Sequence, residues 1–101
     1  MMDYTNKTNR SCVYDAFERA GLPVNESMLN GVIAGDVFSL LEQYGYVVYR
    51  KGVLVSLPSD EGFFIIRTPK NEAAHAEYHI SPEGVAEYPS ESVCAIAIKA
   101  G

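Results

Sequence analysis

The chain is poor in basic residues, histidine and cysteine, and it contains no tryptophan. Its 8 basic residues stand against 13 acidic ones, which gives a net charge of −5. This balance excludes a general binder of nucleic acid or of anionic membranes, because both attract positively charged surfaces. No apolar run reaches the ~18 residues of a membrane-spanning helix, and the first residues lack the apolar segment of a signal peptide. We therefore expect a cytoplasmic protein without membrane contact.

Several kinds of chemistry lack their motifs in this chain. No glycine-rich phosphate loop is present. His75-x-Glu77 matches the His-x-Glu of zinc deaminases, but the Pro-Cys-x-x-Cys that completes such a site is missing. His75, Glu77 and His79 can share one face of a strand, but they lack a fourth ligand for a metal ion. We therefore expect neither a metal nor a cofactor.

The length and the hydrophobic content of the chain fit one domain over residues 1–101. Hydrophobic residues make up 48% of the chain, and the length suits one core. Periodicity predicts helices over residues 11–20, 26–30 and 37–44, the second capped by Asn25 and the third by Asp36. Runs of β-branched and aromatic residues predict strands over residues 46–50, 53–57, 63–68, 75–80, 85–88 and 93–99. Helices followed by an antiparallel meander indicate an α+β fold, with N-terminal helices packed on a C-terminal antiparallel sheet.

The first predicted helix carries a cysteine in its first turn. One apolar helical stripe recurs along it, formed by Val13, Ala16, Phe17 and Ala20. Asn9 or Ser11 can cap its start, and Gly21 ends it. Cys12 therefore lies where the helix dipole and unpaired backbone N–H groups favour the thiolate over the thiol. The alternative interpretation is a small buried residue of the core, which is also how we interpret Cys94.

Both histidines fall on one predicted strand, residues 75–80. Alternation places His75, Glu77 and His79 on the same face of that strand. The two imidazoles are then about 13 Å apart along the strand, so at most one of them reaches Cys12 directly. A helix-leading cysteine and a histidine far downstream on a strand are the parts of a thiolate–imidazolium pair. Ordinary hydrogen-bonded sheet residues are the other interpretation of both histidines.

Asn-x5-Cys at a helix start, followed by helices and a sheet whose strand opens with Ala-His-Ala, resembles a minimal papain-like cysteine peptidase. The compact bacteriocin-processing-type and ovarian-tumour-type thiol proteases are the most similar in layout. The resemblance implies that Cys12 is the nucleophile and that His75, within Ala-His-Ala, is the general base. It also implies that Asn6, at the position where the family more often has glutamine, donates to the oxyanion.

The third residue of a papain-like site orients the catalytic histidine. The family usually follows its histidine with Asp or Asn on the next strand, and this chain has neither after Asn71. If residues 82–84 form a three-residue loop, strand pairing places Glu91 opposite His75, whereas a slip of one residue leaves Ser90 there. Glu91 is therefore the candidate third residue.

These features predict a thiol-dependent hydrolase that cleaves a peptide or isopeptide bond, with a protein or peptide as its substrate. The alternative is a catalytically inactive papain-like protein, small and acidic, that binds and modulates another protein. Its compactness would then fit a phage or mobile-element origin. The two hypotheses differ in whether Cys12 is an activated nucleophile or an ordinary thiol.

Overall fold

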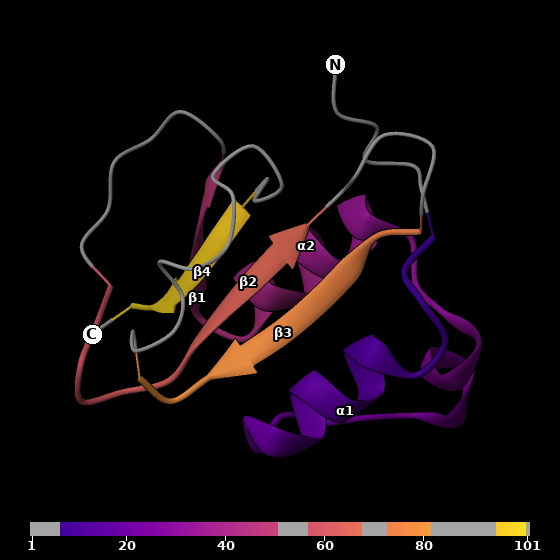
Figure 1. Ribbon diagram of the computed structural model, residues 1–101, viewed down its shortest axis with the longest axis horizontal. Helices are drawn as coiled ribbons and strands as arrows, with labels where there is room; N and C mark the ends of the chain where they lie inside the picture. The colour runs from indigo at the N-terminus through magenta and orange to yellow at the C-terminus, as the bar shows by residue number, and fades with distance from the viewer. Residues whose placement is uncertain (1–6, 51–56, 68–72, 82–94, 101) are drawn as a thin grey trace.

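The computed structural model describes residues 7–50, 57–67, 73–81 and 95–100, in which helices cover one face of an antiparallel sheet (Figure 1). In chain order the elements are α1 (Cys12–Arg19), the 3-10 helix η1 (Glu26–Asn30), α2 (Ala34–Gln43), β1 (Tyr46–Arg50), β2 (Phe63–Arg67), β3 (His75–His79) and β4 (Ala95–Lys99). The α+β class is thus confirmed. The strand predicted over residues 85–88 lies outside the described residues, as does most of the one predicted over residues 53–57.

Helix α1 forms where its apolar stripe predicts it. Val13, Ala16 and Phe17 are buried by the fold, with at most 3% of each residue exposed. The helix ends at Gly21, whose φ of 76° suits a residue without a side chain. The Gly21 N–H donates to the Glu18 carbonyl and the Leu22 N–H donates to the Phe17 carbonyl, at 3.1 and 2.9 Å. These two bonds make a Schellman motif, which satisfies carbonyls that a helix end leaves unpaired.

The caps of the two later helical segments differ in origin. The Asn25 side chain accepts a hydrogen bond from the Ser27 N–H, as expected for the cap of η1. The prediction that Asp36 caps α2 is wrong, because α2 begins earlier and Ile33 holds the cap position. The Ile33 carbonyl accepts from the N–H groups of Asp36 and Val37, so backbone bonds start this helix without a side-chain cap. Asp36 lies in the first turn, where its charge complements the helix dipole.

The described strands form a four-stranded antiparallel sheet in the order β1-β4-β2-β3. The predicted meander is wrong for this sheet, because β4 lies between β1 and β2 instead of following β3 at the edge. The two central strands are the apolar ones: all residues of β2 except the last are buried, and so are Ala95 and Ala97 of β4. Strand β3 carries polar side chains on one face and takes an edge position.

The main core lies between the helices and one face of the sheet. That face supplies Phe64 and Ile66 from β2 and Ala76 from β3, and α1 covers it with its buried stripe. The other face of the sheet carries a smaller cluster of Phe63 and Ile65. Strand β3 therefore presents Ala76 and Tyr78 toward the helices, and its remaining side chains point to the opposite side.

Candidate active site

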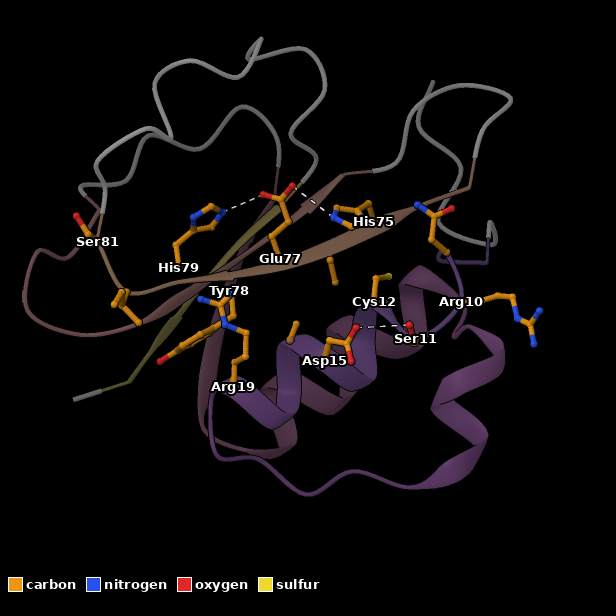
Figure 2. A pocket seen from close by; sticks show the side chains of 14 residues that line it. Arg10, Ser11, Cys12, Asp15, Arg19, His75, Glu77, Tyr78, His79 and Ser81 are labelled. Carbon is orange, nitrogen blue, oxygen red and sulfur yellow. Dashed lines mark hydrogen bonds and ion pairs between the residues drawn. The ribbon is translucent and has the colours of Figure 1, made fainter.

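A hollow of about 590 Å³ lies along β3 and beside the start of α1. Its lining comes from residues 9–12, from the α1 residues Asp15, Ala16 and Arg19, and from residues 75–81. Figure 2 shows α1 and β3 running side by side, with Cys12 and His75 toward one end of the hollow and Arg19, His79 and Ser81 toward the other. The hollow thus includes the two residues on which the sequence places chemistry.

Hydrogen bonds of the segment before α1 bring these distant parts of the chain together. The Asn9 N–H donates to the Ala74 carbonyl at 2.8 Å, and the Ala74 N–H donates to the Lys7 carbonyl at 2.9 Å. Thr8 is 5% exposed, and its hydroxyl accepts from the Val32 N–H at 2.9 Å. Residues 7–9 are therefore held against the residue that precedes β3, which sets the place where α1 begins.

Cys12 is the first residue of α1 and is 9% exposed. The residue before it, Ser11, has a φ of 61° in the left-handed region, and its side chain makes no cap hydrogen bond. The predicted cap by Ser11 is therefore wrong in its chemistry, although Ser11 does hold the cap position. The Cys12 N–H donates to the Asn9 carbonyl through a long bond of 3.4 Å. The thiol lies at the helix N-terminus, partly in the core and partly in the lining of the hollow.

The opposite face of β3 carries a cluster built on one carboxylate. Glu77 lies 3.4 Å from Nε2 of His75, 2.9 Å from Nε2 of His79 and 3.3 Å from Nη2 of Arg67. Arg67 comes from β2, directly opposite His75 in the register. The shared face of His75, Glu77 and His79 follows the predicted alternation. Both imidazoles reach the same carboxylate, although their backbones stand far apart along the strand.

His75 uses only one of its two ring nitrogens in this cluster. Its Nε2 faces Glu77, whereas Nδ1 is buried and has no hydrogen-bond partner in the described part of the protein. When Nε2 carries the proton and donates toward Glu77, Nδ1 is left with its lone pair. This is the tautomer that a general base needs, and a carboxylate on the other nitrogen is the usual means of selecting it.

His79 is placed differently. Its ring stacks on Phe63 with centroids 5.7 Å apart, and it lies at the end of β3 away from Cys12 (Figure 2). The stacking and the 2.9 Å contact to Glu77 hold this ring in position. Of the two histidines, His75 is the one at the Cys12 end of β3 (Figure 2).

The Cys12 thiol and the His75 imidazole do not contact each other in this conformation. Figure 2 shows Cys12 on the helix side of β3 and His75 with Glu77 on the other side. Ala76 packs in the same core as Cys12, so strand alternation turns the neighbouring His75 away from α1. No hydrogen bond joins the two groups among the described residues.

The remaining predicted site residues, Asn6 and Glu91, lie outside the described residues, as does Cys94. Sequence reasoning missed Glu77 as the carboxylate for His75. The signal for this role is strand alternation, which places Glu77 on the same face as both histidines. In the part of the chain that the structure describes, no group of three His, Cys, Asp or Glu side chains is arranged to hold a metal ion.

No protein-family model matches this chain, and no curated protein and no solved structure matches it either. Within the described ranges, no helix has both the length and the apolar character needed to cross a membrane.

Proposed function

We propose that this protein is a thiol-dependent hydrolase of papain-like layout that cleaves a peptide or isopeptide bond. Cys12 is the nucleophile and His75 is the general base. The observation that carries the proposal is the lining of one hollow by Cys12 and by a histidine whose Nε2 faces a carboxylate and whose Nδ1 has no partner. Glu77 takes the orienting role for which the sequence offered Glu91.

The reaction follows from these positions. Nδ1 of His75 takes the thiol proton, and Sγ of Cys12 attacks the carbonyl carbon of the substrate. The tetrahedral intermediate collapses when His75 gives that proton to the leaving amine, which leaves a thioester on Cys12. A water molecule, deprotonated by His75, then attacks the thioester, and the acid product leaves as the thiol is restored. Glu77 acts before these steps, because its contact with Nε2 selects the tautomer of His75 that leaves Nδ1 free to accept a proton.

The proposal requires His75 to turn around the edge of β3, because its ring and the Cys12 thiol lie on two sides of the strand (Figure 2). His75 begins β3 and its side chain is 39% exposed, and the rotation gives up its 3.4 Å contact with Glu77. The proposal requires the free protein to reach this turned position as well, because the thiolate–imidazolium pair forms before the substrate is attacked. The oxyanion would accept from the Cys12 N–H, once released from its 3.4 Å bond to Asn9, and from Asn6 as the family resemblance implies.

The backbone at Ser11 gives independent support. A non-glycine residue in the left-handed region stores about 1–3 kcal/mol, and such residues gather at active sites. Ser11 is the only non-glycine residue with positive φ in the described ranges, and it directly precedes Cys12. Strain at this position sets the entry of α1 and hence the direction in which the thiol points.

The test is the rate of alkylation of Cys12 by iodoacetamide at pH 6, in a Cys94→Ser background that leaves Cys12 as the single thiol. An ordinary thiol is less than about one per cent ionised at that pH, so it reacts slowly. We expect Cys12 to react at least ~10-fold faster than N-acetylcysteine, because His75 holds its proton. His75→Ala should remove this advantage, and Glu77→Gln should reduce it.

His79→Ala is the matched control, since it also removes an imidazole from Glu77 but at the far end of β3. It should keep most of the rate advantage. Alkylation that is slow, and equally slow in His75→Ala and His79→Ala, would sink the hydrolase proposal.

The second candidate function is an inactive papain-like protein that binds and modulates another protein. The separation of the thiol and the imidazole across β3 favours it (Figure 2). Under this function Cys12 is a core residue with ordinary reactivity. Alkylation at pH 6 would then match N-acetylcysteine and would not change with His75→Ala.

A further inference from the structure

Asn30 and Gly31 form the only Asn-Gly pair in the sequence. An asparagine holds its side-chain amide carbon close to the backbone nitrogen of the next residue, which favours an intramolecular attack of that nitrogen. A side chain on the next residue hinders the approach, and Gly31 has none. Each of the four other asparagines precedes a lysine, an arginine or a glutamate. The attack therefore meets the least hindrance at Asn30.

The fold leaves Asn30 open to this chemistry. Asn30 is the last residue of η1 and is exposed to water. Within the described ranges, no hydrogen bond holds its side chain. Asn25, just before η1, is exposed too, but its Oδ1 accepts a hydrogen bond of 3.0 Å from the Ser27 N–H. The two asparagines of this segment thus differ both in their own contacts and in the residue that follows.

The attacking nitrogen is held in the closed form of η1. The Gly31 N–H donates to the Met28 carbonyl at 3.1 Å, so this bond has to open before the nitrogen can react. The segment is a 3-10 helix of 5 residues, of which Met28 alone is buried. A short 3-10 segment with few buried contacts opens locally at a small cost in free energy. Local opening of η1 therefore exposes the nitrogen while the rest of the fold stays intact.

We propose that Asn30 is a site of spontaneous modification, at which a succinimide ring forms with Gly31 and is opened by water to isoaspartate. The Gly31 nitrogen loses its proton and bonds to Cγ of Asn30. The bond from Cγ to Nδ2 breaks, and the side-chain nitrogen takes up a proton and leaves as ammonia. Water then adds to one of the two ring carbonyls. Addition at the main-chain carbonyl leaves the backbone running through Cβ and Cγ, whereas addition at Cγ gives ordinary aspartate.

Isoaspartate at this position lengthens the backbone by one methylene directly before a close contact. An added Cβ on Gly31 would lie 2.7 Å from the Thr8 carbonyl oxygen, so this backbone has no room to shift toward Thr8. The next residue, Val32, accepts from the Thr8 N–H and donates to the Thr8 hydroxyl, both at 2.9 Å. The longer link cannot keep the Gly31 N–H on Met28 and the Val32 backbone on Thr8 together.

The contact that is lost holds one side of the hollow. Thr8 lies in the segment of residues 7–9, which bonds to Ala74 and sets where α1 begins. Release of Thr8 from Val32 therefore loosens the start of α1, where Cys12 lines the hollow. The change runs in one direction, because the ammonia has left and asparagine is not restored. It needs only water, so it occurs whether or not the protein is a hydrolase.

The first test incubates the folded full chain at mildly alkaline pH and follows each asparagine by peptide mass mapping. We expect Asn30 to react at least ~10-fold faster than Asn25, because Glu26 hinders attack there. Unfolding in urea should speed the reaction at Asn30, since the Met28 bond is then open. Asn30→Gln, whose side chain closes only a larger ring, should stay unmodified at this position. Reaction at Asn25 as fast as at Asn30 would overturn the proposal.

The second test isolates the isoaspartyl form by chromatography and measures its amide hydrogen exchange. The amides of Thr8 and Val32 should exchange at least ~10-fold faster than in the unmodified protein, because their mutual hydrogen bonds are lost. Freshly prepared Asn30→Asp is the matched control, since it carries the added charge on an ordinary backbone. Its Thr8 and Val32 amides should exchange as in the parent. Unchanged exchange in the isoaspartyl form, or equally fast exchange in Asn30→Asp, would contradict the effect of the longer backbone.

Discussion

At Gly31 the backbone has a φ of 91°, and an added Cβ would lie 2.7 Å from the Thr8 carbonyl oxygen. The close approach fixes residues 7–9, since Thr8 also exchanges hydrogen bonds of 2.9 Å with the backbone of Val32. The same segment bonds to Ala74 and so sets the distance between α1 and β3. The sequence marks Gly31 only as the end of a helix. Its contact with Thr8 spans 23 residues and is visible only in the fold.

Replacing Gly31 tests this contact. We expect Gly31→Ala to lower the free energy of unfolding by about 3 kcal/mol, because the new Cβ meets backbone that cannot move aside and the φ is strained. Gly21→Ala is the control: its φ is 76°, but nothing lies within 4 Å of the added Cβ, so it should cost about 1 kcal/mol. Urea unfolding measures both. Equal losses in the two variants would show that the approach to Thr8 does not constrain the fold.

At the scale of one element, the local sequence predicts the buried stripe and the end of α1 but not the conformation of its start. Its buried stripe and its Gly21 end are the ones that periodicity and capping rules predict. Its start is different, because Ser11 occupies the cap position without capping and takes a left-handed backbone instead. The hydrogen bonds that hold residues 7–9 against Ala74 dictate this turn, and those bonds are tertiary.

Substitutions at Ser11 measure the strain at the start of α1. A β-branched side chain is the least tolerant of a left-handed φ, so Ser11→Val should lower the free energy of unfolding by about 1–2 kcal/mol. Ser11→Gly relieves the strain and should leave stability unchanged or raise it by up to about 1 kcal/mol. Thermal unfolding of the two variants under one condition gives the comparison. A valine variant as stable as the glycine variant would contradict a strained turn.

At the scale of the whole molecule, Phe64 joins three elements of the fold. Its ring centroid lies 5.5 Å from that of Phe17 on α1, 5.2 Å from that of Tyr46 on β1 and 5.0 Å from that of Tyr78 on β3. Tyr46 is 6% exposed, and burial raises the pKa of its hydroxyl above the usual 10.0, with smaller contributions from Tyr78 and Glu61. Ionisation of this tyrosine therefore opposes the packed state of the whole core.

The pH dependence of unfolding follows from the sign of that shift. A raised pKa means that the folded protein holds the Tyr46 proton more tightly than the unfolded chain, so this contribution is complete below pH 10. It is lost as the pH rises above 10 and through the higher pKa of the folded protein. Tyr46→Phe should lose less stability than the parent between pH 9 and about 11.5 in urea unfolding. Tyr49→Phe, on the same strand, is the control and should follow the parent.

Local sequence predicts part of the candidate site, and the packing of β3 against α1 decides the rest. The place of Cys12 in the first turn of a helix, and the shared face of His75, Glu77 and His79, follow from periods of 3.6 and 2 that local sequence displays. Which side of β3 faces α1 does not follow from those periods. Ala76 and Tyr78 point into the core, so the histidines lie on the far side from Cys12.

The sequence by itself determined the α+β class, the approximate bounds of both helices and of the described strands, and the residues of α1 that are buried. These depend on interactions between residues a few positions apart. Only the tertiary structure decided that β4 inserts between β1 and β2, that β3 ends the described sheet, and that Glu77 faces His75. Pairing between distant strands depends on which apolar faces can be buried together, and that choice is made by the whole chain at once.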